Sequence, residues 1–270
     1  MHYAIVDNKL VEAKPGLIGL CPGCSQPVTA KCGTQRIHHW AHGNNKTCDS
    51  WWESETEWHR SWKNNFPAEW QEIFLPDELT GEKHIADVCT DQGLVIEFQH
   101  SHIDPEQRTT REKFYKTMIW VVDGMRLKGD YNRFLKSKDF FQTIKKGIFK
   151  FNYPEECFPT EWIGSSVAVI FDFRKNESKD NHEDIRNHLY CLFPMNLGSS
   201  SICAEIPRKA FLSAIIDGTW LLRYRNFMDN VSIVNQEWQH QKELQRRQRD
   251  NINFERFSRA FRYQQLKGRF

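Results

Sequence analysis

The sequence lacks a long apolar segment, and its first residues contain no hydrophobic stretch of the kind found in secretory signal peptides. The longest stretch without an acidic or basic residue, 187–204, is interrupted by Pro194, Asn196, Gly198 and three serines. Such a stretch cannot form the continuous apolar helix that crosses a bilayer. We therefore expect a soluble, cytoplasmic protein with no membrane partner.

A large net charge is also absent, because 37 Lys and Arg residues against 35 Asp and Glu residues give +2 over 270 residues. Bulk charge therefore provides no argument for nucleic-acid binding, and only a local basic patch could hold phosphates. Disorder is excluded by an aromatic content of 13% that includes 10 Trp. The length suits one large domain or two smaller ones.

Cysteine and histidine are concentrated in the first 50 residues, which hold four of the eight Cys and four of the eleven His. The CPGC sequence at 21–24 is a CxxC turn, and a redox role is disfavoured because no βαβ pattern surrounds it. A small module buries little core, so a closed tetrahedral metal site would stabilise it. The predicted structural zinc ligands are Cys21, Cys24, His42 and Cys48, with Cys32 and His39 in reserve.

Apolar runs and turn residues divide the chain into four segments. Residues 1–50 predict a small β-rich module. Residues 51–150 follow the order helix, strand, strand, helix, strand, which predicts an α/β sheet core. Residues 151–235 predict an appended β-containing region that includes a mixed run near 215–224. Residues 236–270 predict a basic helical tail, with nine basic and four acidic residues. For this tail, a solvated helix with three Phe is favoured over an arm that contacts phosphates.

The core segment contains a predicted hairpin of strands 84–89 and 94–99, and the next helix is predicted to begin with Asp104 as its N-cap. If the turn centres on Gln92, Asp87 lies opposite Glu97, with Cβ atoms about 4.5–5.5 Å apart. Two such carboxylates repel each other unless a cation joins them or one is protonated. The alternative is a solvent-facing strand with incidental acids, because a shifted register would separate the pair.

Polar side chains also share one face of each helix that flanks the hairpin. Surface ion pairing is the ordinary interpretation of both stripes, and the nearby Trp cluster at 51, 52, 58 and 62 is expected in the core. The stripes are Glu55, His59 and Lys63 before the hairpin, and Arg108, Arg111 and Tyr115 after it.

Together these motifs resemble the competence protein CoiA-like family, a branch of the PD-(D/E)XK nuclease superfamily. The resemblance covers roughly residues 20–125. It implies an α+β or α/β fold with a restriction-endonuclease-like αββαβ core, a small N-terminal zinc-binding β module, and a C-terminal β-containing region plus helical tail. The motifs are CPGC (21–24), HHWAHGNNKTC (38–48), ETEWHRSWK (55–63), HIADV (84–88), IEFQHSHI (96–103) and QRTTREKFYKTMIWV (107–121).

The resemblance also implies an active site on the hairpin. Asp87 and Glu97 would bind a catalytic Mg²⁺ or Mn²⁺ together with the Phe98 carbonyl. Glu55 and His59 would form an auxiliary pair from the first helix.

Gln99 would take the position that is usually Lys, whereas Ala86 in place of Pro removes no chemical group. An amide can orient water but cannot accept a proton, so the role of base would fall to His59 or to metal-activated water.

The implied function is that of a Mg²⁺-dependent deoxyribonuclease, which hydrolyses phosphodiester bonds in DNA processing, recombination or defence against foreign DNA. Arg108 and Arg111 would hold the DNA backbone without reading its sequence. One alternative is a non-catalytic nucleic-acid-binding or adaptor protein on a nuclease scaffold. Another is a zinc-stabilised protein-interaction module. A protein partner or homo-oligomer stays open.

Overall fold

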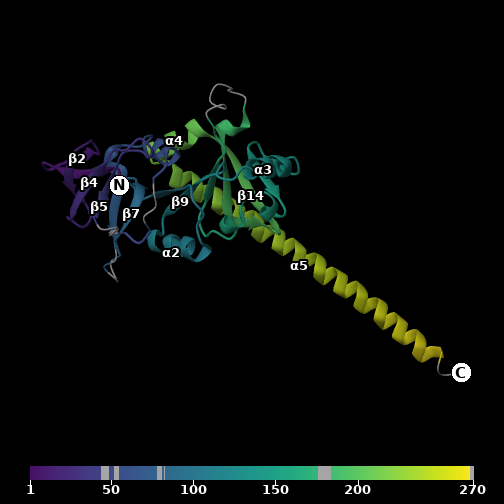
Figure 1. Ribbon diagram of the computed structural model, residues 1–270. Coiled ribbons are helices and arrows are strands. Elements are labelled where there is room, and N and C mark those ends of the chain that lie inside the picture. Colours follow the sequence, from purple (N-terminus) through teal and green to yellow (C-terminus); the bar gives the residue numbers. More distant parts are fainter. Residues whose placement is uncertain (44–48, 52–54, 78–80, 82, 176–183, 268–270) are drawn as a thin grey trace.

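The computed structural model contains two β-sheets and several helices (Figure 1), which confirms the mixed α and β class. The structure describes residues 1–43, 49–51, 55–77, 81, 83–175 and 184–267, with backbone alone for residues 252 and 257–267. Cys48 and Trp52 therefore lie outside the described residues. No helix in these ranges combines the length and the hydropathy needed to cross a membrane.

The N-terminal module is a five-stranded antiparallel sheet with the strand order β2-β1-β3-β4-β5. Its core surrounds Trp40, which is 1% exposed and donates its indole N–H to the carbonyl of Val11 at 2.9 Å. The predicted β-rich character of this segment is thus confirmed. The strands are β1 (Tyr3–Val6), β2 (Lys9–Glu12), β3 (Ile18–Leu20), β4 (Pro27–Lys31) and β5 (His39–His42).

The second sheet has nine strands in the order β10-β11-β14-β13-β12-β9-β8-β7-β6. The pairs β8–β9 and β9–β12 are parallel, and the other neighbours are antiparallel. The strands are β6 (Gln71–Pro76), β7 (Lys83–Cys89), β8 (Val95–Gln99), β9 (Met118–Asp123), β10 (Gln142–Lys145), β11 (Ile148–Phe151), β12 (Val169–Asp172), β13 (His188–Leu197) and β14 (Ser200–Pro207).

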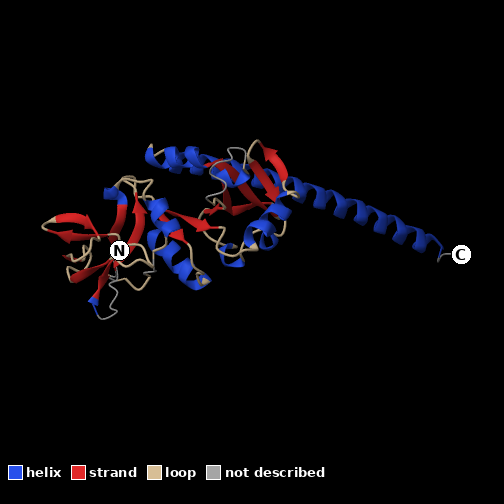
Figure 2. Cartoon of the chain, turned by 45° about the horizontal axis from the view of Figure 1, so that its top comes forward, coloured by secondary structure: helices blue, strands red, loops and turns tan. Residues whose placement is uncertain are grey.

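Helices cover both faces of this sheet (Figure 2). Side chains alternate along β9, so Ile119 and Val121 join one core while Trp120 and Val122 join the other. The first core packs against α1 (Glu57–Lys63), α4 (Arg208–Ile216) and the start of α5 (Trp220–Lys267). The second packs against α2 (Pro105–Tyr115) and α3 (Asp130–Lys138). The 3₁₀ helices are η2 (Ala68–Trp70), η3 (Pro154–Glu156), η4 (Thr160–Trp162) and η6 (Ile185–Asn187).

The element order of the core differs from the predicted αββαβ by one strand, because β6 precedes the hairpin. β6 has no clear alternation of apolar and polar residues and ends in Pro76. A proline is tolerated there because β6 is the edge strand of the sheet. Two further differences lie beyond residue 150. The strands β12, β13 and β14 extend the same sheet, and the run near 215–224 comprises the end of α4, a short turn and the start of α5.

The predicted hairpin and the following helix are confirmed in detail. Val88 pairs with Ile96 and Cys89 with Val95, which is the register that places Asp87 opposite Glu97. Gly93 closes the turn with φ of 75°, and its N–H donates to the carbonyl of Thr90. At the start of α2, the Asp104 carboxylate accepts the N–H of Glu106 at 2.8 Å, as an N-cap does.

The apolar side chains of the hairpin are divided between the two cores of the sheet. The core that contains α1 includes Val88, Leu94, Ile96 and Phe98. Ala86 packs in the opposite core instead. The regular pairing of β7 with β8 ends at Val88 and Ile96, so alternation no longer fixes the position of Ala86.

The C-terminal helix α5 begins at Trp220, sixteen residues before the predicted tail. Its first turns pack on β13, where the rings of Phe193 and Phe227 lie 4.3 Å apart. From residue 236 onward every side chain that the structure describes is exposed, and the helix extends away from the body (Figure 1). The described part of the tail is therefore a solvent-exposed helix, as predicted, and Phe254 in it is 71% exposed.

Glu72 of β6 connects the N-terminal module to the larger sheet. Its carboxylate accepts the backbone N–H groups of His2 at 2.7 Å and Tyr3 at 3.2 Å, and it pairs with the ammonium group of Lys63 at 3.0 Å. Phe74 adds an apolar contact, because a Cβ on Gly23 would lie only 1.7 Å from its ring. A side chain at position 23 would therefore separate the CPGC turn from the sheet.

We expect Glu72→Gln to lower the free energy of unfolding by about 2–4 kcal/mol, because it removes a charge that stabilises a buried ammonium and two N–H groups. Chemical denaturation monitored by circular dichroism measures the loss. Glu69→Gln, at an exposed position of η2, is the matched control and should change stability little. Equal losses in the two variants would contradict this role.

The stabilisation by Glu72 should also depend on pH. Burial opposes ionisation of this carboxyl, but Lys63 and the N-terminal ammonium lower its pKa. A lowered pKa means that the stabilisation is present above the ordinary value near 4.5 and is lost as the pH falls through the folded-state value. The stability difference between wild type and Glu72→Gln should therefore be constant above about pH 5 and shrink below about pH 4.

Candidate functional site

A small cavity of about 60 Å³ lies where α1 meets β6, β7 and β8. Its volume accommodates an ion with a few waters but not a nucleotide. Five carboxylates and three basic side chains line it. The polar residues of the lining are Asp49, Glu55, His59, Lys63, Glu72, Asp87, Glu97, Gln99, Arg111 and Tyr115.

Three of the carboxylates lie in one row across neighbouring strands. Glu72 sits between the paired positions 71↔88 and 73↔86, so it faces Asp87, which in turn faces Glu97. The carboxylates also replace backbone ladder bonds. Glu97 Oε1 accepts the N–H of Asp87 at 3.2 Å, and Asp87 Oδ2 accepts the N–H of Phe98 at 2.9 Å. Each acid of the predicted pair is thus held by the strand opposite to its own.

The two acids differ in their electrostatic surroundings. Burial and then the charge of Asp87 raise the pKa of Glu97 to about 8. Burial also opposes ionisation of Asp87, but the charge and hydrogen bond of His59 lower its pKa. His59 Nε2 lies 2.9 Å from Asp87 Oδ2. At neutral pH the pair therefore carries about one negative charge in the absence of a cation, since repulsion prevents both groups from ionising.

Glu55 and Lys63 belong to an ion-pair network beside these acids. Glu55 precedes α1, whose N-cap is Thr56, so it does not share the helical face predicted for it. It is nevertheless paired with Arg60 and lies 2.7 Å from Lys63 Nζ. Burial disfavours the charge on Glu55, but Arg60 and Lys63 hold its pKa well below the ordinary value. Lys63 is 2% exposed and stays protonated, because Glu72 and Glu55 outweigh burial and raise its pKa.

Gln99 and Phe98, both predicted site residues, line the same cavity. The Gln99 amide is buried and donates to the hydroxyl of Ser101 at 2.9 Å. The amide is therefore held at the end of β8 by a neighbouring residue.

The two predicted DNA-binding arginines of α2 are both buried. Arg108 is 5% exposed, and its guanidinium donates to the carbonyls of Glu161 at 2.8 Å and Gly164 at 3.2 Å. Those bonds give it a structural role rather than the predicted contact with phosphate. Arg111 lies 3.5 Å from Glu97 and donates to the carbonyl of Trp51 at 3.0 Å, so it faces the cavity instead of the protein surface.

Tyr115 adds a group whose role the sequence did not indicate. Its side chain lines the cavity at 8% exposure, and its buried hydroxyl has no hydrogen-bond partner among the described residues. Burial and then the charge of Glu97 raise the pKa of Tyr115 far above the ordinary value, so the hydroxyl remains a donor. An unsatisfied buried hydroxyl is costly unless a ligand or water bonds to it.

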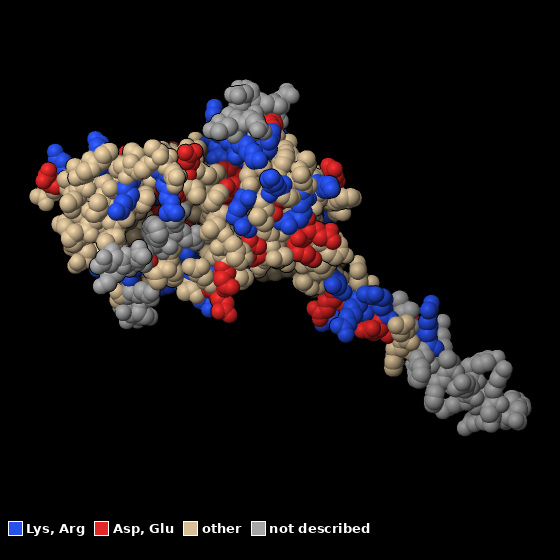
Figure 3. All heavy atoms as spheres, viewed as in Figure 1, with Lys and Arg blue, Asp and Glu red and all other residues tan. Residues whose placement is uncertain are grey.

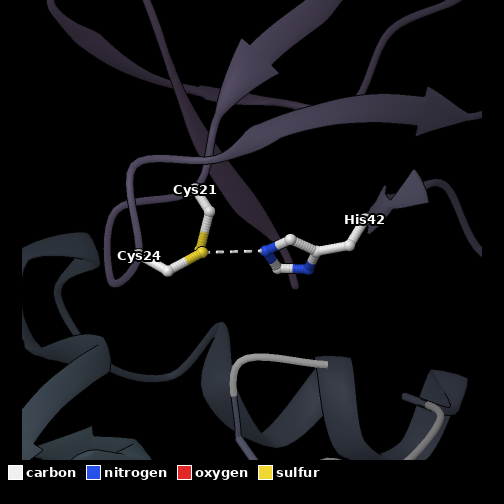
Figure 4. A group of neighbouring side chains, drawn as sticks. All are labelled: Cys21, Cys24 and His42. Carbon is white, nitrogen blue, oxygen red and sulfur yellow. Dashed lines mark hydrogen bonds between the residues drawn. The ribbon is translucent and has the colours of Figure 1, made fainter. Parts of the chain in front are cut away.

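A second group of chemically reactive side chains lies in the N-terminal module (Figure 4). The Sγ atoms of Cys21 and Cys24 and a ring nitrogen of His42 lie within 4.8 Å of one another. Cys24 Sγ is 3.2 Å from His42 Nε2. Two thiolates and an imidazole are a donor set that zinc accepts, so this cluster could bind such a metal. The structure thus brings together three of the four predicted ligands, while Cys48 lies outside the described residues.

Comparison with known families agrees with this organisation. Residues 20–50 match the model of the competence protein CoiA N-terminal domain, and they contain the cysteine and histidine cluster. Residues 80–153 match the competence protein CoiA nuclease-like domain, and they contain the carboxylate hairpin. The chain thus carries a nuclease-like domain. The two matches confirm the predicted relationship to the competence protein CoiA-like family over these regions. The curated proteins and the solved structures gave no match.

The cysteine cluster predicts which substitutions remove zinc. Purified protein should contain about one zinc per chain by elemental analysis, and Cys24→Ser should lose it together with thermal stability. Cys32→Ser is the matched control, since Cys32 is half-buried in the same module but lies outside the cluster. Full zinc occupancy in Cys24→Ser would contradict the assignment.

Proposed function

We propose that this protein is a metal-dependent nuclease that hydrolyses phosphodiester bonds of DNA. The observation that carries the proposal is the buried pair of Asp87 and Glu97, which face each other across two strands and open into one small cavity. Burying two carboxylates together is unfavourable without a compensating cation or proton. The nuclease-like family match over the same residues supports this interpretation.

The side chains of the cavity fit a hard divalent cation. Carboxylate oxygens are the ligands that Mg²⁺ and Mn²⁺ prefer, and the cavity has room for an ion with some of its waters. The unsatisfied hydroxyl of Tyr115 in the same cavity also indicates that a ligand or water belongs there. In this proposal Asp87, Glu97 and the Phe98 carbonyl hold Mg²⁺, and Zn²⁺ in the N-terminal module has a structural role.

The order of strands and helices around this pair also supports a PD-(D/E)XK-like core. The acids lie on an antiparallel hairpin, α2 follows it, and β9 returns parallel to β8. The additional strand β6 extends this arrangement at its edge without interrupting it.

The other side chains then have distinct roles. Bound Mg²⁺ would neutralise charge on the scissile phosphate and activate water. Position 99 is Gln instead of the usual Lys, but Lys63 provides a buried positive charge in the cavity. Gln99 orients water through its amide. His59 is held against Asp87, where it can accept or return a proton. Arg111 positions Glu97.

The second candidate function is a DNA-binding or adaptor protein that does not cleave. Two features favour this candidate. Gln99 replaces the usual Lys, and the carboxylate of Glu55 is already paired with Arg60 and Lys63. A protein of that kind would bind DNA equally well when Asp87 or Glu97 is replaced and would cut no substrate.

The nuclease proposal predicts that Asp87→Asn and Glu97→Gln each reduce DNA cleavage by about 10²–10³-fold or more, because each removes a ligand charge from the metal. Cleavage is measured on linear, circular, single-stranded and branched DNA with Mg²⁺ or Mn²⁺. Glu106→Gln, at an exposed position of α2, should cut as fast as wild type. Wild-type rates in both cavity variants would identify a contaminating nuclease and overturn the proposal.

Tyr115 provides a subtler test of the same cavity. We expect Tyr115→Phe to reduce cleavage by about 10- to 100-fold, because it removes a donor aimed at a substrate or water oxygen. Its thermal stability should stay unchanged or rise, since the hydroxyl has no partner in the folded protein. Undiminished cleavage, or destabilisation without a change in rate, would remove Tyr115 from the site.

A further inference from the structure

A second charged cluster lies at the carboxyl ends of the parallel strands, outside the cavity. At its centre is Asp172, the last residue of β12, which is 2% exposed. Its Oδ2 accepts the indole N–H groups of Trp58 at 3.1 Å and Trp62 at 2.9 Å. Its Oδ1 accepts the backbone N–H of Arg174 at 3.0 Å and pairs with the guanidinium of Arg208. Both oxygens of this carboxylate are thus fully engaged.

Two Arg side chains, those of Arg174 and Arg208, lie beside the Asp172 carboxylate. Arg174 and Arg208 lie close enough that burial and the charge of Arg208 lower the pKa of Arg174. The guanidinium of Arg208 is held over the ring of Trp62 at 4.3 Å as well as against Asp172. The Nε atoms of Arg174 and Arg208 are buried and have no hydrogen-bond partner among the described residues. Asp172 pairs with the guanidinium of Arg208 but bonds only to the backbone N–H of Arg174, so two Nε groups that no described residue engages, beside one fully engaged carboxylate, favour an additional anion.

The position of this cluster relates it to the carboxylate cavity. Asp172 pairs with Asp123 in the parallel sheet, and the Asp123 carboxylate lies 2.7 Å from the ring of His100, the residue that follows β8. His100 lies three residues after Glu97. Two strand spacings of about 4.8 Å place the Asp172 position roughly 10 Å across the sheet from β8. Ligands of open α/β sheets bind outside the carboxyl ends of the strands, which is where this row lies.

The helix α1 spans the two regions. His59 faces Asp87 in the cavity, whereas the preceding residue, Trp58, binds Asp172 and lies 6.2 Å from the ring of His100. Figure 3 shows Lys and Arg side chains gathered on the surface between α4 and α3 as these are placed in Figure 1. The helix α1 thus carries side chains of both the carboxylate cavity and the Asp172 cluster.

We propose that Arg174 and Arg208 form a phosphate-binding subsite that holds the DNA backbone a few nucleotides from the scissile bond. Asp172 positions Arg208 through its ion pair, and the guanidinium of Arg208 packs against the ring of Trp62. This inference rests on the proposed function for the identity of the ligand, a backbone phosphate of DNA. It replaces the contact predicted for Arg108, whose guanidinium is occupied by backbone carbonyls.

The test measures binding of a fluorescein-labelled DNA oligonucleotide by fluorescence anisotropy at several salt concentrations. All proteins carry Glu97→Gln and are measured with Mg²⁺, so that the DNA stays intact. Loss of one phosphate contact should reduce the slope of log K against log salt by about 0.7–0.9. We expect Arg174→Gln to show this reduction and to bind roughly five- to tenfold more weakly at 0.1 M salt.

Two further variants separate a specific contact from general charge. Arg225→Gln removes the same charge from an exposed position of α5 and should leave the slope unchanged. Arg174→Lys retains the charge and should restore the slope. An unchanged slope in Arg174→Gln, or an equal reduction in Arg225→Gln, overturns the subsite, as does a parent protein that binds no DNA.

The outcomes for the subsite and for the enzyme can be distinguished. Cleavage by the wild type combined with an unchanged slope in Arg174→Gln overturns the subsite alone. A reduced slope in a protein that cuts no DNA supports the subsite and overturns the nuclease proposal.

Discussion

Three carboxylates of like charge are buried side by side on neighbouring strands, and the structure around the cavity depends on how their charges are compensated. Glu72, Asp87 and Glu97 face one another across β6, β7 and β8, and each has a basic neighbour that offsets its charge: Lys63, His59 and Arg111. The compensation is incomplete at Glu97, because burial and then the charge of Asp87 raise its pKa despite the nearby Arg111. A cavity with unbalanced carboxylates and an unsatisfied hydroxyl is suited to a divalent cation.

The same row links the two sheets of the molecule. Lys63 pairs with Glu55 beside the cavity and with Glu72. The Glu72 carboxylate also accepts the backbone N–H of His2, just before β1. The N-terminal module is therefore attached through an ion pair that also borders the carboxylate site. Metal binding by Cys21, Cys24 and His42 would stabilise a module whose position depends on this attachment. This arrangement favours a bracing role for the module.

Local patterns in the sequence predicted the hairpin register, the Asp104 cap and three converging side chains of a candidate metal site, because each depends on a few neighbouring residues. The strand β6 was missed because edge strands tolerate proline and need no alternation. The roles of Arg108 and Asp172 depend on contacts between residues more than 35 positions apart, which spacing along one helix cannot reveal. Helical periodicity placed Arg108 on a face of α2, but tertiary packing decided that this face is buried.

The most direct test of the central claim is X-ray diffraction from crystals soaked in Mn²⁺, with data collected near the manganese absorption edge. The account predicts an anomalous peak between the carboxylates of Asp87 and Glu97, and no peak there in Glu97→Gln crystals. Wild-type crystals without manganese between these two side chains, and with their oxygens directed apart, would contradict the account.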